Sequence, residues 1–191
     1  MKPIIFSTPM VKAILEGRKT QTRRVIKVDD DPENWKISIE GTSIVRTEPY
    51  DVKLPRYAAG DILWVRETWA TVSSGIIEYK ATYIEPYTGS TEIDHIGKKI
   101  TWRPSIYMPR EAARIFLKVT NVRVERLQDI TEEDAKAEGC IDGKSKDVLK
   151  FDLTARDVFA KLWNSINAKR GYRWETNPWV WVIEFERINK E

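Results

Sequence analysis

Residues 7–24 read STPMVKAILEGRKTQTRR, which predicts a short amphipathic helix followed directly by a basic loop. Ser7 or Thr8 can cap this helix, and Gly17 is typical of a helix end. The loop that follows carries four cations and two threonines, groups that bind phosphate or supply a nucleophile. We therefore expect the functional site here, and the plain alternative is a solvent-exposed basic turn.

The composition is that of a globular protein, because 191 residues of which 41% are hydrophobic can bury a core in one domain. We expect a single domain over residues 1–191, with insertions near residues 29–55, 86–99 and 139–153. No stretch approaches the ~18 apolar residues of a membrane span, and the first residues lack the apolar region of a signal peptide. The sequence predicts a cytoplasmic protein that does not bind membranes.

Metal and thiol chemistry have little support in the sequence. Cys140 is the only cysteine and His95 the only histidine, so one chain cannot build a disulfide or a Cys/His zinc site. His95 lies in a polar run typical of a surface loop, and Cys140 follows a helix end, where packing is favoured over a nucleophilic role. We expect no metal and no cofactor, and the sequence does not indicate an oligomeric state.

Charge is segregated along the chain, although the net charge is only +3. Residues 1–27 carry seven positive and one negative side chains, and residues 98–126 carry eight and two. If these two blocks converge in space, they form a phosphate-binding surface suited to RNA or a nucleoside ligand. The alternative is that the two blocks face different directions.

Alternating and periodic apolar residues predict a mixed α+β fold. Strands are expected at residues 4–6, 62–66, 76–84, 115–124 and 179–188, and loops at 29–55 and 102–110. Four or five strands with few helices favour a small mixed β-barrel with flanking short helices.

Two capping boxes predict further helices. Thr131 with Asp134 opens a short helix that ends at Gly139, and Thr154 with Asp157 opens a longer one. The longer helix carries an apolar stripe that we expect to face the core. Its members are Val158, Phe159, Leu162, Trp163 and Ile166.

Several segments occur in an order that resembles the ASCH domain family. They are residues 7–24, the turn at Gly60 and Asp61, the helix at 130–138 and the strand at 179–185. Residues 64–69 and the loop at 103–109 are similar to the longer ASCH proteins of prophages and phages. The resemblance implies a PUA-like β-barrel, a fold associated with RNA binding and RNA-modifying enzymes.

The resemblance also implies candidate catalytic residues. In short bacterial ASCH enzymes that hydrolyse N4-acetylcytidine, a lysine, a threonine and a glutamate act at positions that match Lys19, Thr22 and Glu138. Thr22 would attack the acyl carbon, Lys19 would act as the base, and Glu138 would orient or shuttle the proton. Arg24 would stabilise negative charge. The alternative is that Lys19 and Glu138 form a structural ion pair.

We predict a pocket formed by the loop with Lys19 and Thr22, the helix with Glu138 and the loop at residues 103–110. Tyr107 could stack on a base, as could Trp69 and Trp102, for which core packing is favoured. The predicted substrate-binding residues are Arg18, Thr20, Arg23, Arg24, Arg103, Ser105, Tyr107 and Arg110.

Competing functions follow from these features. The first is an RNA- or modified-nucleoside-binding protein, and the second is an amidohydrolase of acylated nucleosides. The third is a ribonuclease, which no paired-carboxylate metal site or usable histidine supports. The fourth is a non-catalytic phage accessory protein that binds another protein through exposed tryptophans.

Overall fold

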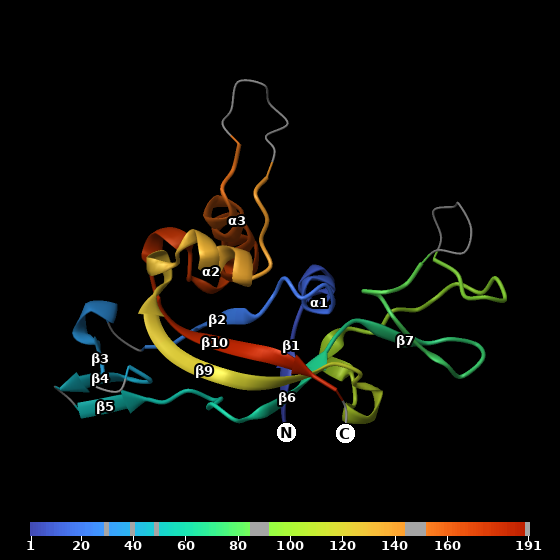
Figure 1. The fold of residues 1–191 in the computed structure, drawn as a ribbon, viewed down its shortest axis with the longest axis horizontal. Helices are drawn as coiled ribbons and strands as arrows, with labels where there is room; N and C mark the ends of the chain where they lie inside the picture. Colours follow the sequence, from blue (N-terminus) through green and yellow to red (C-terminus); the bar gives the residue numbers. More distant parts are fainter. Residues whose placement is uncertain (29–30, 39–40, 48–49, 85–91, 144–151, 190–191) are drawn as a thin grey trace. The chain divides into compact units, whose positions relative to one another are not determined.

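The protein folds into two compact units that alternate along the chain. Unit 1 comprises residues 1–16, 62–118 and 187–191, and unit 2 comprises residues 17–61 and 119–186. The computed structural model describes residues 1–28, 31–38, 41–47, 50–84, 92–143 and 152–189 (Figure 1). Each unit is described by itself below.

The largest sheet has five strands in the order β1-β6-β9-β10-β2. In unit 1, β1 pairs in parallel with β6, and β6 pairs in antiparallel with the start of β9. In unit 2, β10 pairs in antiparallel with β2. The strands are β1 (Lys2–Ile5), β2 (Gln21–Val25), β6 (Ile62–Arg66), β9 (Phe116–Arg126) and β10 (Trp179–Ile188).

The predicted α+β class is confirmed, because this mixed sheet is accompanied by only three α-helices in the described part of the chain. The strand order leaves β1 and β2 as edges, so the sheets of the described residues are not closed into a barrel. The PUA-like barrel therefore stays a prediction.

Unit 1 combines the first helix with a hairpin and two single-turn helices. The helix α1 (Thr8–Leu15) follows Ser7, whose extended backbone is that of an N-cap residue. The other elements are β7 (Trp69–Thr71), β8 (Ile77–Tyr79), η2 (Ser105–Tyr107) and η3 (Arg110–Ala112). The strand predicted at 76–84 is thus shorter than expected, because a turn at residues 80–82 ends β8.

A tryptophan cluster forms part of the core of unit 1. Six buried residues make it up, namely Trp64, Trp69, Met108, Ala112, Ala113 and Phe116. The predicted core role of Trp69 is confirmed, since its exposed fraction is 6%. Trp102 is half-buried beside a second cluster that contains Ile100, and its indole donates to Glu92.

Unit 2 carries two helices, α2 (Glu132–Ala137) and α3 (Ala155–Asn167), which pack together on one face of β10 (Figure 1). Both capping predictions are confirmed, because Thr131 accepts from the Asp134 N–H and Thr154 from the Asp157 N–H. Each cap is worth about 1 kcal/mol of helix stability. The helices bury Ala135, Ala155, Phe159 and Trp163 against Val180 and Val182.

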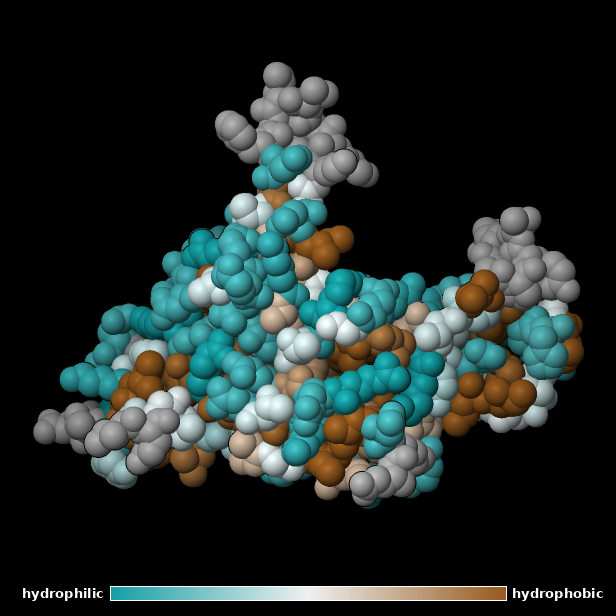
Figure 2. Space-filling model, viewed as in Figure 1, coloured by the Kyte–Doolittle hydropathy of each residue, from teal (hydrophilic) through white to brown (hydrophobic). Residues whose placement is uncertain are grey.

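One position of the predicted stripe on α3 is wrong. Ile166 is 44% exposed, whereas Phe159 and Trp163 are buried. At the end of the helix Asn167 takes the buried position instead, and its amide donates to the Trp163 carbonyl. Over α2 and α3 the surface in Figure 2 is largely hydrophilic, as expected once the apolar stripe faces inward.

The loop predicted at residues 29–55 contains a small antiparallel sheet. Its strands are β3 (Lys36–Ile37), β4 (Ile44–Thr47) and β5 (Tyr50–Lys53), and η1 (Pro32–Asn34) precedes them. The reason is Trp35, which is 2% exposed and lies beneath the cationic groups of Arg46 and Lys53. Cation–π contacts from two strands therefore order a segment of weak apolar pattern.

The other two predicted insertions are described only in part. Residues 92–99 form a turn closed by a bridge between Ile93 and Lys99, and Gly143 bridges to Leu153. Residues 86–91 and 144–151 lie outside the described residues. In the described part of the chain, no helix is both long and apolar enough to cross a bilayer.

Candidate functional site

The basic loop that opens unit 2 is anchored by a buried ion pair. Lys19 and Glu138 are 2% and 4% exposed, and Lys19 Nζ lies 2.6 Å from Glu138 Oε2. The same ammonium donates to the Glu138 carbonyl oxygen at 2.8 Å, and the two residues form an isolated β-bridge. The ion pair that the sequence left as an alternative is therefore present, and it ties the loop to the end of α2.

Arg23 extends this ion pair into a network of buried charges. Its guanidinium contacts Glu138 at 3.3 Å, Glu125 at 2.5 Å and Asp134 at 3.0 Å. Gln21 donates to the Asp134 side chain at 3.0 Å, so Gln21 and Arg23 both face α2. Within this network each buried cation contacts a carboxylate, which offsets the cost of removing both charges from water.

Burial lowers the pKa of the Lys19 ammonium, and the charge of Glu138 opposes this effect. Burial also lowers the pKa of the Arg24 guanidinium, again against the charge of Glu138. Burial raises the pKa of Asp134, but the hydrogen bond from Gln21 and the charge of Arg23 outweigh it and hold this pKa below its ordinary value.

Thr22 lies on the other face of β2 from Arg23. Val182 pairs with Arg23 and belongs to the core under the helices, whereas Ile183 pairs with Thr22. Because side chains alternate along a strand, Thr22 points away from the face that carries Arg23. No hydrogen bond joins Thr22 to Lys19 or Glu138 within the described residues. The catalytic roles of these three residues stay a prediction.

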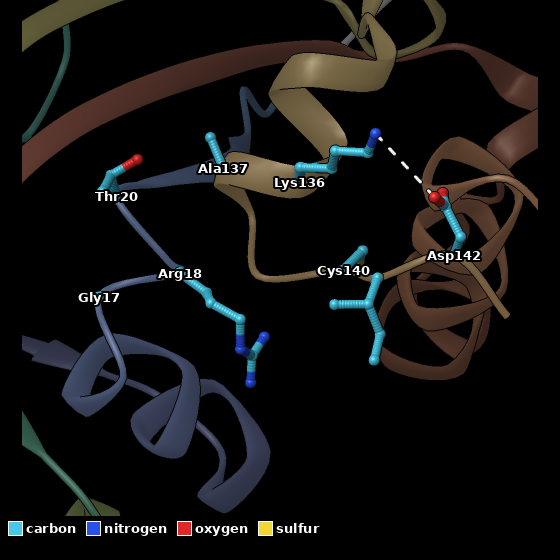
Figure 3. A pocket seen from close by; sticks show the side chains of 8 residues that line it. Gly17, Arg18, Thr20, Lys136, Ala137, Cys140 and Asp142 are labelled. Atoms are coloured by element: carbon cyan, nitrogen blue, oxygen red, sulfur yellow. Dashed lines mark ion pairs between the residues drawn. The ribbon is translucent and has the colours of Figure 1, made fainter.

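A pocket lies beside the ion pair, between the basic loop and the segment that follows α2. Its volume is about 480 Å³, which is within the range of small-molecule sites. Figure 3 shows residues 17–20 along one side and residues 136–142 along the other. The lining residues are Gly17, Arg18, Thr20, Lys136, Ala137, Cys140, Ile141 and Asp142.

The pocket has charged and apolar parts. Arg18 donates to the Gly139 carbonyl at 2.8 Å, which holds its side chain along the pocket. Lys136 Nζ lies 4.0 Å from Asp142 Oδ2 across the pocket (Figure 3), and both side chains are more than half exposed. Such an exposed pair is weak and can give way to a ligand. Ile141 and Cys140 supply an apolar wall.

Cys140 contributes shape rather than reactivity. The residue is buried in the core that includes Phe159, and burial raises the pKa of its thiol to about 11. At neutral pH the thiol is therefore protonated and weakly nucleophilic. This agrees with the packing role expected from the sequence. His95 is exposed in a turn of unit 1, as expected.

The predicted substrate-binding residues fall into two sets. In unit 2, Arg18 and Thr20 line the pocket, Arg23 lies in the buried network and Arg24 is half-buried. Arg103, Ser105, Tyr107 and Arg110 belong to unit 1, where Ser105 is half-buried and the others are exposed. The predicted convergence of the two sets in one pocket stays a prediction.

The sequence reasoning missed the wall formed by Lys136, Cys140, Ile141 and Asp142. Part of this wall could have been predicted, because the family resemblance places Glu138 in the same site as the loop and these residues flank Glu138. What the sequence did not indicate is that the charged network fills the space around Glu138, so that the pocket opens beside it. Within the described residues, no group of three or more His, Cys, Asp or Glu side chains could hold a metal ion.

Comparisons with known proteins give little support for a family. No protein-family model matches the chain, and no curated protein matches it either. One similar solved structure is protein EF3133 from Enterococcus faecalis V583, described as family-model DUF984. The two sequences are 12% identical, and the match covers 99% of this chain and 82% of the EF3133 chain. The TM-score is 0.43. A likeness at this level carries no argument, so membership of the ASCH family stays a prediction.

Proposed function

We propose that this chain binds RNA or a modified nucleoside, and that the ligand occupies the pocket between residues 17–20 and 136–142. The observation that carries the proposal is the pocket itself, which the basic loop and the end of α2 form together. Arg18 and Lys136 supply positive charge for a phosphate group. Asp142 can accept a hydrogen bond from an amino group, and Ile141 can pack against a base.

The buried network supports this proposal as a scaffold. Lys19 and Glu138 join the two walls of the pocket, so their distance fixes how far the walls stand apart. Because both side chains are almost fully buried, a ligand in the pocket would meet Arg18 before it met Lys19. Binding in a preformed site therefore fits these residues better than chemistry on Lys19 does.

We extend the proposal to the fold family: the chain is an ASCH protein with a PUA-like architecture. The ordered sequence features support it, and the α+β class is compatible with it. Fold alone does not decide function, so the site has to be tested directly.

The test is a titration of a short, fluorescently labelled single-stranded RNA, with cytidine and cytidine monophosphate as competitors. Arg18→Ala and Lys136→Ala should each weaken binding about tenfold, as expected for the loss of one charged hydrogen bond. The slope of log affinity against log salt concentration should also become less steep in each variant, because one phosphate contact is lost.

Two controls carry the same change of charge away from the pocket. Arg173 is exposed after α3, and Lys161 is exposed on α3. Arg173→Ala and Lys161→Ala should leave the affinity within about twofold, because neither side chain reaches the pocket. If all variants weaken binding equally, the charge is used without a defined site and the pocket is not the binding site.

An amidohydrolase activity is the second candidate, and the lowered pKa of Lys19 favours it. A buried lysine that loses its proton more readily is what a general base requires. The test is hydrolysis of N4-acetylcytidine and related acylated nucleosides, followed by chromatography. Turnover that Lys19→Ala and Thr22→Ala abolish would support catalysis, whereas no turnover by the wild-type protein would rule it out for these substrates.

A further inference from the structure

An acidic side chain lines the pocket of unit 2 together with its two cations. Asp142 belongs to the same wall as Lys136, and Arg18 belongs to the wall formed by residues 17–20 (Figure 3). A negative charge at this place weakens the attraction of the two cations for an anion. The pocket therefore suits a ligand that carries a hydrogen-bond donor for the carboxylate as well as a phosphate group.

The start of α3 fixes the Asp142 side chain. Its Oδ1 atom accepts from the Ala155 N–H at 3.0 Å, and Ala155 is the first residue of the helix. This bond satisfies one of the N–H groups that a helix leaves without a partner at its start. The carboxylate is thus held in one orientation, although 64% of the side chain is exposed.

The second oxygen of Asp142 is turned toward Lys136 (Figure 3). The Oδ2 atom lies 4.0 Å from Lys136 Nζ, which is beyond hydrogen-bond distance. Among the described residues no group donates a hydrogen bond to this oxygen. The bond to Ala155 therefore leaves one fixed acceptor atom that a ligand in the pocket can use.

We propose that Asp142 accepts a hydrogen bond from the base-pairing edge of one unpaired base, a proposal that rests on the nucleotide binding proposed above. Each RNA base carries at least one N–H group on this edge, and a carboxylate can accept from it. In a duplex the complementary base occupies the same edge. The ligand is therefore single-stranded RNA or a free nucleotide, whose phosphate group lies at Arg18 and Lys136.

The test compares positional isomers in which a methyl group either blocks this edge or leaves it open. The probes are the 5′-monophosphates of 3-methyluridine and 5-methyluridine, each in competition with the labelled single-stranded RNA. They have the same charge and composition, but only the 5-methyl isomer keeps the N–H at position 3. It should compete about tenfold better, as expected for a hydrogen bond to a charged group. The monophosphates of N4,N4-dimethylcytidine and 5-methylcytidine form a second pair.

Asp142→Asn tests the residue without removing the acceptor of the Ala155 N–H. The amide oxygen can take this bond, which leaves the NH₂ group turned toward the pocket as a donor. The ratio of the two affinities should fall to about one, whatever the lost charge does to both of them. Asp142→Ala should remove the preference as well. Glu175→Gln, an exposed change outside the pocket lining, should keep it.

The same RNA annealed to its complement provides an independent measurement. The duplex should bind about tenfold more weakly than the single strand, because its bases cannot present this edge to Asp142. The higher charge density of a duplex acts in the opposite direction, so simple attraction to phosphate groups cannot produce this result. Equal or tighter binding of the duplex contradicts the proposal.

The outcomes separate this proposal from the binding on which it rests. A preference for the open isomer that Asp142→Asn removes supports it. Equal competition by both members of each pair overturns it and leaves nucleotide binding in place, and so does a preference that persists in a folded Asp142→Asn protein. If neither the RNA nor any monophosphate binds, both proposals fail.

Discussion

Two sets of cations, one from each unit, have opposite kinds of partner. In unit 2, Lys19 and Arg23 are buried, and each lies within hydrogen-bond distance of a carboxylate. In unit 1, Arg66 and Arg103 lie on tryptophan rings, and no carboxylate among the described residues pairs with them. The paired charges hold segments together, whereas the stacked charges cover the faces of buried aromatic rings. A basic residue in the sequence can therefore be held by an acid or by an aromatic ring, and the sequence alone does not say which.

The largest effect should come from removing the acid that Lys19 and Arg23 share. Glu138→Ala leaves Lys19 without its carboxylate in a buried environment, and should lower the free energy of unfolding by about 3–5 kcal/mol. Denaturant titration followed by circular dichroism measures this loss. Glu133→Ala, an exposed change on the same helix, should stay within about 0.5 kcal/mol. A loss below about 1 kcal/mol for Glu138→Ala would mean that the pair behaves like a surface ion pair.

The second effect concerns Arg114, an arginine of unit 1 that pairs with a carboxylate. Arg114→Gln deprives the buried Glu67 carboxylate of both hydrogen bonds, and should cost about 2–3 kcal/mol. The loss should be smaller than for Glu138→Ala because Arg114 is partly exposed, so water can replace it. The same denaturant titration applies, with Arg187→Gln as the reference. Equal stability of the two variants would contradict the prediction.

The third effect is a dependence on pH. The pKa of Asp134 is lower in the folded protein than its ordinary value of 3.8, so the folded state binds this proton less readily than the unfolded state does. Asp134 therefore contributes stability that is fully present above its ordinary pKa and is lost as the pH falls through the lowered one. Unfolding measured from neutral to acid pH should show this loss. Asp134→Asn should make the acid limb shallower, and an unaltered limb would show that other carboxylates dominate.

The smallest effect is expected at the stacked arginine. Arg66→Gln removes a cation–π contact worth about 0.5–1 kcal/mol, and it also removes a buried donor that has no acceptor. The free energy of unfolding should therefore change by less than about 1 kcal/mol. A loss as large as that of Arg114→Gln would remove the contrast between stacked and paired cations.

Much of unit 2 could be predicted because its signals are local. The caps at Thr131 and Thr154 need only residues three positions apart. The apolar residues of β10 alternate strongly enough to predict where the strand begins and ends. The ion pair between Lys19 and Glu138 has no local signal, and its prediction depends on the family resemblance, which places both residues in one site.

The missed elements depend on partners far away in sequence. The small sheet at β3, β4 and β5 forms around Trp35, whose cover comes from Arg46 and Lys53 rather than from an apolar pattern. Likewise, the unpaired donors at Arg66 and Trp69 follow from what does not surround them. An absence of partners has no signature in the order of residues, so only the structure could show these donors.

The interleaving of the two units has a consequence for how the chain is made. Residues 17–61 of unit 2 leave the ribosome before residues 62–118 of unit 1, and each unit then waits for a later segment of its own. Ile188 packs against the tryptophan cluster, so unit 1 gains this contact only after residues 119–186 of unit 2 have been made. Neither unit can fold first as a finished domain, in contrast with proteins whose domains are contiguous and fold in the order of translation. For the same reason, neither unit can be expressed as a single uninterrupted fragment.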